Sequence, residues 1–144
     1  IEKAVKQNGS QSILAVIEYR KSLFGNITCT IRCGTTTIKK SPSSLARELE
    51  AKGVGELMLS CIDRDGTGTG YDLKTIEEIS AAVKIPVIAS CGSHNIEDFK
   101  KAKEAGASAA AAGSQFVYFG SQKSVLINYP ITESMREKYF FDQN

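Results

Sequence analysis

The sequence predicts an α/β protein built on parallel strands, because short apolar runs alternate with segments of helical spacing along its 144 residues. Strands are expected to begin near Ile13, Leu57, Pro86 and Ser108, and a helical segment follows each of them. This order predicts right-handed helical crossovers between parallel strands. Four such units form either a small doubly wound sheet or half of an eight-stranded barrel, and periodicity alone does not choose between them.

The amino-terminal part is expected to contain the end of a helix, a strand and an antiparallel excursion. Residues 1–8 have helical spacing, and Gly9 follows as a helix stop. The apolar run over 13–17 predicts a buried strand that ends at Glu18. Alternating apolar residues and glycine turns over 24–40 then indicate a small antiparallel excursion.

The later helices are expected to begin at residues that commonly cap helices. Ser41 precedes Pro42, which is placed at a first helical position. Asp72 and Asn95 precede the next two helical segments. A last amphipathic helix is expected around Thr132 to Phe140.

The stretch ELMLSCIDRDGTGTGYD, over 56–72, is the most informative part of the sequence for function. Its apolar run leads to Asp63, Arg64 and Asp65, and a glycine-spaced loop follows over 66–70. A buried strand that ends in two carboxylates and a guanidinium is typical of a parallel strand whose carboxyl end meets a ligand. The alternative is an ordinary Asp-Gly turn with a salt bridge, which accounts less well for a polar cluster at the strand end. We therefore expect functional side chains at this edge.

Two later strand ends carry the small residues that a phosphate site needs. Ser90 and Gly92 precede one helix, and Gly113 and Ser114 follow the next strand. Small residues let backbone amides approach an anion. Turn formation alone is the alternative for each pair, but two successive strands that end this way favour phosphate binding.

Three carboxylates, Glu18, Asp63 and Asp65, are candidates for general acid–base chemistry, because they are expected to converge at one rim. Arg64 is a candidate for orienting one of them or for contacting an anionic substrate. A solvated surface position is an equally good interpretation of Glu18. His94 is interpreted as a surface residue of a polar loop.

Composition excludes several classes of partner. The net charge of +2 and the lack of a clustered basic face argue against nucleic acid, and the sequence has no apolar run long enough to cross a membrane. The four cysteines form no CxxC pair, and only one histidine is present, so the sequence offers few ligands for a metal site. We expect reduced thiols in a cytoplasmic protein, with no metal and no cofactor.

One family combines these features. SCIDRDGTGTGYD resembles the signature SIDRDGT-x-x-GYD of the cyclase subunit of imidazole glycerol phosphate synthase, and the similarity continues through IPVIASCGS, AGASAAAAGS and FVYFG. It also reaches back to NGSQSILAVIEYR. The similarity covers nearly the whole chain but only the carboxyl-terminal half of the family's (βα)8 TIM barrel. It implies that residues 1–144 form a single half-barrel domain of four βα units, strands five to eight. Such a domain is a fragment of a complete barrel or a partner for one.

The resemblance also implies roles for individual residues. It implies that Glu18 and Asp65 are catalytic. The implied substrate-binding residues lie in the loop after the second parallel strand: Asp63, Arg64 and Thr67. The implied phosphate-binding residues lie at the two later strand ends: Ser90, Gly92, Gly113 and Ser114.

The chain departs from the family pattern in three ways. Glu18 stands where the family has a catalytic aspartate, and Cys91 stands where it has a glycine of the phosphate loop. We expect the family's first half-barrel to be missing from residues 1–144. A longer acid places its oxygens differently, and a displacement of about 1 Å lowers catalysis substantially. We therefore expect the isolated chain to be inactive as a cyclase.

Three functions follow from the resemblance. The first is a cyclase-like lyase of histidine biosynthesis that uses glutaminase-derived ammonia on a phosphorylated ribosyl intermediate. The second is a non-cyclising subunit that delivers ammonia for sugar amidation in surface polysaccharide synthesis. The ending VLINYP resembles that branch, whose expected partners are a glutaminase and an amidotransferase. The third is a phosphate-binding half-barrel that associates with a missing half or with a second copy, because four strands leave open edges.

Overall fold

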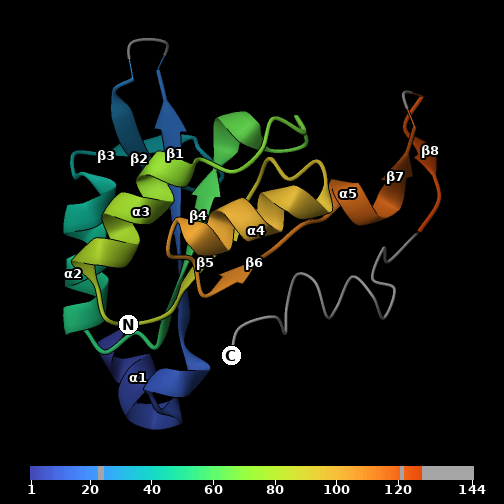
Figure 1. Cartoon of the computed structure of the whole chain (residues 1–144). Helices are drawn as coiled ribbons and strands as arrows, with labels where there is room; N and C mark the ends of the chain where they lie inside the picture. Colours follow the sequence, from blue (N-terminus) through green and yellow to red (C-terminus); the bar gives the residue numbers. More distant parts are fainter. Residues whose placement is uncertain (23–24, 121, 128–144) are drawn as a thin grey trace.

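The computed structural model describes residues 1–22, 25–120 and 122–127. They form a six-stranded sheet of order β3-β2-β1-β4-β5-β6, with a separate two-stranded sheet β7-β8 (Figure 1). The strands are β1 (Leu14–Lys21), β2 (Ile27–Ile31), β3 (Thr36–Ile38), β4 (Glu56–Cys61), β5 (Val87–Ser90), β6 (Ala109–Ala110), β7 (Tyr118–Phe119) and β8 (Ser124–Val125). The α-helices are α1 (Glu2–Asn8), α2 (Pro42–Ala51), α3 (Leu73–Ala82), α4 (Ile96–Glu104) and α5 (Ser114–Val117).

The centre of the sheet is parallel. β1 pairs with β4, β4 with β5, and β5 with β6, all in parallel, and helices α2, α3 and α4 occupy the connections. This arrangement confirms the predicted α/β fold with neighbouring parallel strands, and it fits part of a TIM barrel.

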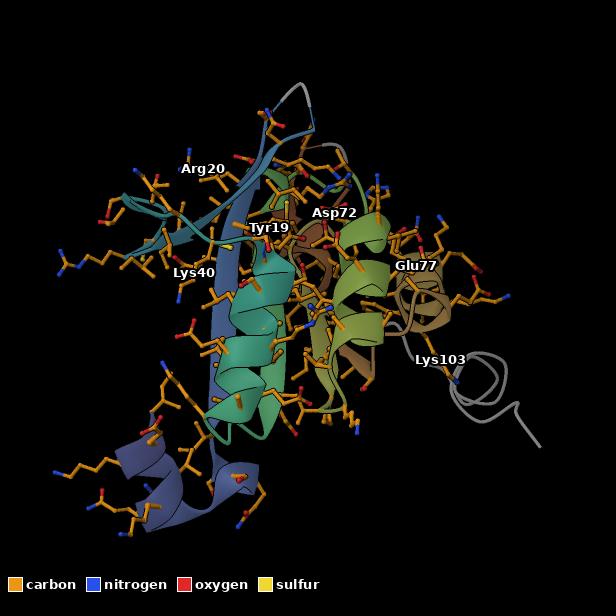
Figure 2. The ribbon with its side chains drawn as sticks, turned by 90° about the vertical axis from the view of Figure 1, so that its left-hand side faces the viewer. Tyr19, Arg20, Lys40, Asp72, Glu77 and Lys103 are labelled. Carbon is orange, nitrogen blue, oxygen red and sulfur yellow. The ribbon has the colours of Figure 1, made fainter. Side chains whose placement is uncertain are left out.

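One face of the parallel strands forms the hydrophobic core with the helices. Figure 2 shows α2 and α3 side by side against the sheet, and α3 and α4 lie in front of it in Figure 1. The strands contribute alternate residues to this core, and α3 contributes its inner stripe. The buried residues include Ile17, Leu57, Leu59, Val87, Ala89, Ile76 and Ile79. Burial of alternate strand residues is what the period of two predicts.

The opposite face of the same strands carries a different set of side chains, and we call it the open face. Val16, Met58 and Ile88 lie in register across β1, β4 and β5. Val16 is 50% exposed, and Leu14, two residues before it, is 41% exposed. Large aliphatic side chains are therefore accessible on this face of the described structure.

The predicted antiparallel excursion is confirmed as the hairpin of β2 and β3, which pairs with β1. The expected end of the first strand at Glu18 is wrong, because β1 continues to Lys21. β4 pairs with β1 as far as Tyr19, whereas β2 pairs with residues 18–21 as an antiparallel partner. Arg20 and Lys21 therefore remain hydrogen-bonded in a ladder beyond the end of β4. Glu18 consequently lies inside a strand that has neighbours on both sides.

Two helix starts show how local signals and tertiary contacts compete. Ser41 caps α2 as predicted, because its Oγ accepts a hydrogen bond from the Ser44 N–H at 3.2 Å. Asp72 occupies the N-cap position of α3, but its carboxylate makes no cap hydrogen bond and instead contacts other side chains.

The carboxyl-terminal part agrees with the prediction only in part. The expected strand SAAAAGS is reduced to Ala109–Ala110. The helix expected around Thr132 to Phe140 and the last three residues of VLINYP lie outside the described residues.

Candidate functional site

The loops that follow β4 and β5 are joined by backbone contacts. The Gly70 N–H donates to the Gly92 carbonyl oxygen at 2.7 Å. The Arg64 guanidinium donates to the carbonyl oxygens of Thr69 and Gly70, at 3.2 and 2.8 Å. Gly92 has φ +99°, and a Cβ there would lie 2.3 Å from the Gly70 carbonyl oxygen. Only glycine allows this approach without displacing one loop.

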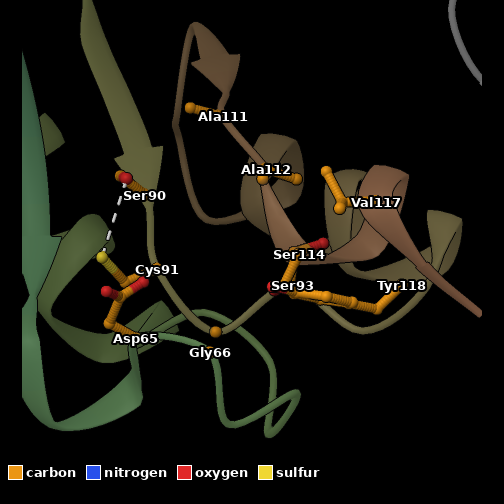
Figure 3. Close-up of a pocket in the computed structure, with 12 residues that line it drawn as sticks. Asp65, Gly66, Ser90, Cys91, Ser93, Ala111, Ala112, Ser114, Val117 and Tyr118 are labelled. Atoms are coloured by element: carbon orange, nitrogen blue, oxygen red, sulfur yellow. Dashed lines mark hydrogen bonds between the residues drawn. The ribbon is translucent and has the colours of Figure 1, made fainter. Parts of the chain in front are cut away.

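A pocket of about 320 Å³ opens where these loops meet the loop after β6 (Figure 3). Asp65 and Gly66 supply one side of it. The loops after β5 and β6 supply the rest of the polar lining, which includes Ser90, Cys91, Gly92, Ser93, Gly113 and Ser114. The structure therefore brings the predicted Asp65 and all four predicted phosphate residues around one cavity.

Cys91 is the unusual residue of this lining. Its φ of +71° lies in the left-handed region, which costs a residue with a side chain about 1–3 kcal/mol. Its Sγ lies 3.4 Å from Ser60 Oγ and 3.8 Å from Ser90 Oγ, and Figure 3 draws the second contact. These contacts hold the thiol against the ends of β4 and β5.

Three predicted substrate residues have bonds within the protein. The Asp63 carboxylate accepts a hydrogen bond from the Lys21 backbone N–H at 2.7 Å and so ties the end of β1 to this loop. Arg64 braces the glycine loop as described above. The Thr67 hydroxyl donates to the Arg64 carbonyl oxygen at 2.8 Å. These residues shape the rim, and substrate contact by them remains a prediction.

Glu18 lies on the open face, in the same row as the pocket. It is in register with Ser60 of β4, and Ser60 is in register with Ser90 of β5. Register partners in neighbouring strands project from the same face of a sheet. Glu18 therefore lies in the row that carries Ser90, but it does not line the pocket and does not stand at the end of its own strand. Its catalytic role remains a prediction.

A buried polar network on the helix-covered side joins β1 to α3. Asp72 accepts hydrogen bonds from Lys21 Nζ at 2.9 Å, Thr75 Oγ1 at 2.7 Å and the Tyr19 hydroxyl at 3.4 Å. Figure 2 shows Tyr19 and Asp72 close together between these elements. The sequence predicted only a helix cap at Asp72, since the partners in β1 are distant along the chain.

The network sets the ionisation of its members. Burial raises the pKa of the Tyr19 phenol above its ordinary value, and the neighbouring Asp72 charge adds to this effect. Burial by itself would raise the pKa of Asp72, but hydrogen bonds from Thr75 and Lys21 outweigh it and hold the pKa below its ordinary value of 3.8. Asp72 therefore joins β1 to α3 as a carboxylate near neutral pH.

Sequence reasoning did not predict the hydrogen bonds that hold the pocket wall. The Ser93 hydroxyl donates to Gln115 Oε1, and the Tyr71 hydroxyl donates to the Ala111 carbonyl oxygen at 2.9 Å. Burial raises the pKa of the Tyr71 phenol, so it remains a donor. Tyr71 lies inside the stretch 56–72, and its position there was the only sign in the sequence that it belongs to the site. His94 is exposed, as predicted, and its ring lies against Gly68.

The described residues contain no cluster of three or more histidine, cysteine or acidic side chains arranged to hold a metal ion. Within the same part of the chain, no helix has the length and apolar character needed to cross a membrane.

The fold and the site define a class: an α/β protein in which an aspartate and loops of small residues, each following a parallel strand, line one rim pocket. Residues 1–123 match the family described as Histidine biosynthesis protein. The chain belongs to this family.

Named relatives agree with that assignment. The chain is 41% identical to a Pseudomonas aeruginosa protein named provisionally as imidazole glycerol phosphate synthase subunit hisF2, over 90% of this chain and 52% of the relative. It is 38% identical to the imidazole glycerol phosphate synthase subunit HisF of Alkaliphilus metalliredigens, over 82% of this chain and 47% of the relative. The chain thus spans about half the length of the curated relatives it matches.

Proposed function

We propose that this chain forms the carboxyl-terminal half of a cyclase-type subunit of imidazole glycerol phosphate synthase and binds a phosphate group of the substrate in its rim pocket. The observation that carries the proposal is the pocket itself, in which Asp65 faces the same cavity as Ser90, Gly92, Gly113 and Ser114. Backbone amides and hydroxyls of small residues suit a phosphate, and an aspartate beside them suits proton transfer.

The proposed chemistry joins ammonia to a phosphorylated ribosyl intermediate. Asp65 and Glu18 act as the proton-transferring groups, because both carboxylates belong to the carboxyl-end rim of the parallel strands. The loop residues Asp63, Arg64 and Thr67 hold the rim in place and offer further contacts to the substrate. Ammonia comes from a glutaminase partner. The names of the relatives support a partner of some kind, because they describe one subunit of a synthase.

The proposed activity requires a second half-barrel. Val16 and Leu14 are substantially exposed on the open face, and the chain spans about half of its relatives. A complementary half would cover these side chains and close the sheet, which removes exposed strand edges. We propose that residues 1–144 act within such a complete barrel, formed with a preceding segment, a separate chain or a second copy.

The test is isotope-traced turnover by the full-length protein, using labelled ammonia and the phosphorylated ribosyl intermediate. Asp65→Asn should lower turnover about 100-fold or more, as expected for loss of a general acid or base. The matched control is Glu77→Gln, which neutralises an exposed acid on α3 and should leave turnover unchanged. If the full-length protein binds the intermediate but never forms product, the cyclase function is wrong.

That outcome would favour the second function, delivery of ammonia to an amidotransferase that modifies a sugar. The two functions differ in one measurable respect: only the accessory subunit supports sugar amidation in a complex while leaving the ribosyl intermediate intact. Co-purification followed by a sugar amidation assay separates them.

A further inference from the structure

A row of polar side chains crosses four strands at the carboxyl end of the open face. Thr30 of β2 is in register with Glu18 of β1, Glu18 with Ser60 of β4, and Ser60 with Ser90 of β5. The neighbouring row of the same face is apolar, with Val16, Met58 and Ile88. On each of β1, β4 and β5, the open face therefore changes from an apolar to a polar side chain between one residue and the next residue on that face.

Two atoms of this polar row are buried without a hydrogen-bond partner. In the part of the chain that the structure describes, three side-chain oxygens are in this state: Glu18 Oε2, Thr30 Oγ1 and Ser80 Oγ. Two of the three belong to residues that lie directly opposite each other in β1 and β2. Thr30 is only 4% exposed, so its hydroxyl does not have bulk water as a partner.

Buried polar atoms in folded proteins are almost always hydrogen-bonded, and leaving one unpaired is unfavourable. Side chains directly opposite each other in an antiparallel pair have Cβ atoms about 5 Å apart. One small group between Glu18 and Thr30 is therefore within reach of both. A carboxylate accepts hydrogen bonds and a hydroxyl both donates and accepts, so a ligand hydroxyl or amine placed between the two can satisfy both.

The row connects this pair to the phosphate pocket. Ser90 lines the pocket, and the Cys91 thiol contacts both Ser60 and Ser90 beside it. Two strand spacings separate the Glu18 and Ser90 positions, which corresponds to about 10 Å. A ligand with its phosphate in the pocket reaches Glu18 only if it is about as long as a sugar phosphate.

We propose that Thr30 and Glu18 together form a second subsite, which binds a hydroxyl or amine at the far end of a phosphate ester held in the pocket. The inference rests on the proposed phosphate site and extends it across β4 and β1. Thr30 is its new binding residue, placed by the hairpin that follows β1 and distant from the signature stretch. The class of ligand is a polyol or amino-polyol phosphate.

The experiment compares three probes by calorimetric titration of the full-length protein. Sorbitol phosphate carries hydroxyls along a six-carbon chain, hexyl phosphate has the same chain without them, and inorganic phosphate has no chain. The wild-type protein should bind sorbitol phosphate more tightly than both other probes.

Variants then locate the subsite. Thr30→Val keeps the shape of the side chain and removes its hydroxyl, so it should weaken sorbitol phosphate binding about two- to tenfold, the effect of losing one hydrogen bond. Binding of inorganic phosphate should not change. Thr30→Ser should retain most of the affinity. Thr36→Val is the matched control, because Thr36 is an exposed residue of β3 that faces away from the row.

Each outcome has one interpretation. If Thr30→Val alters thermal unfolding but leaves the sorbitol phosphate affinity at the wild-type value, the subsite is wrong and the phosphate site stands. Equal binding of sorbitol and hexyl phosphate would also overturn the subsite alone. If none of the three probes binds, the proposed phosphate function fails, and the subsite fails with it.

Discussion

The two faces of the parallel sheet differ in what they do, although the same strands supply both. On the helix-covered face, Leu57, Leu59 and Val87 are at most 2% exposed and pack into the core. On the open face, Val16 is 50% exposed, and the next row is polar. The comparison teaches that one strand can place core side chains on one face and, with the alternate residues, the side chains of the proposed site on the other.

The first prediction tests whether the helix-covered face carries the stability. Leu59→Ala should lower the free energy of unfolding by about 2–5 kcal/mol, because the truncated side chain leaves a cavity in a packed core. Val16→Ala is its partner on the open face and should cost less than about 1 kcal/mol in this chain. Urea unfolding of both variants measures the difference. Equal losses would show that the two faces are not distinct.

The second prediction concerns the rim. Gly92→Ala should cost about 2–3 kcal/mol, because its Cβ would lie 2.3 Å from the Gly70 carbonyl oxygen and its φ is +99°. Phosphate affinity should fall with it, as the two loops separate. Gly113→Ala is the matched control for stability, since a Cβ there meets no atom within 4 Å. Thermal unfolding and phosphate titration give the two readouts. Wild-type stability in Gly92→Ala would contradict the loop geometry.

The third prediction concerns the network that joins β1 to the start of α3 on the helix-covered face. Asp72→Asn should lower stability by about 1.5 kcal/mol near neutral pH, as expected for loss of hydrogen bonds to a charged group. The folded pKa of Asp72 lies below its ordinary value of 3.8, so its contribution is present above that value. The contribution is lost as the pH falls through the folded pKa. The difference between wild type and variant should therefore shrink in acid, which unfolding at neutral pH and well below pH 3.8 will measure. A difference that grows in acid would refute the assigned sign.

The smallest expected effect tests whether the open face is covered in the complete protein. Val16→Asp should change the stability of residues 1–144 by no more than about 0.5 kcal/mol, as for an exposed site. In a protein that includes the proposed second half, this position should be buried, and the same substitution should be several times more costly. Unfolding curves of both forms decide the matter. A small effect in both would argue against a covering half.

Much of the fold could be predicted because its signals are local. The start of α2 at Pro42 follows from Ser41, and the parallel order follows from alternating strand and helix patterns. The rim pocket could also be predicted, since residues that follow parallel strands meet at one edge, and Asp65 and Gly113 do line one cavity. The length of β1 was mispredicted, because its last residues depend on a partner strand rather than on their own pattern.

By itself, the sequence determined which residues of each strand share a face, where helices begin, and which strand ends carry small residues. Tertiary structure alone decided that Asp72 bonds to β1 instead of capping its helix, and that Thr30 lies opposite Glu18. The physical reason is that alternation relates residues only within a strand. Register between strands depends on how the hairpin and the crossover helices pack, and contacts between distant segments set that packing.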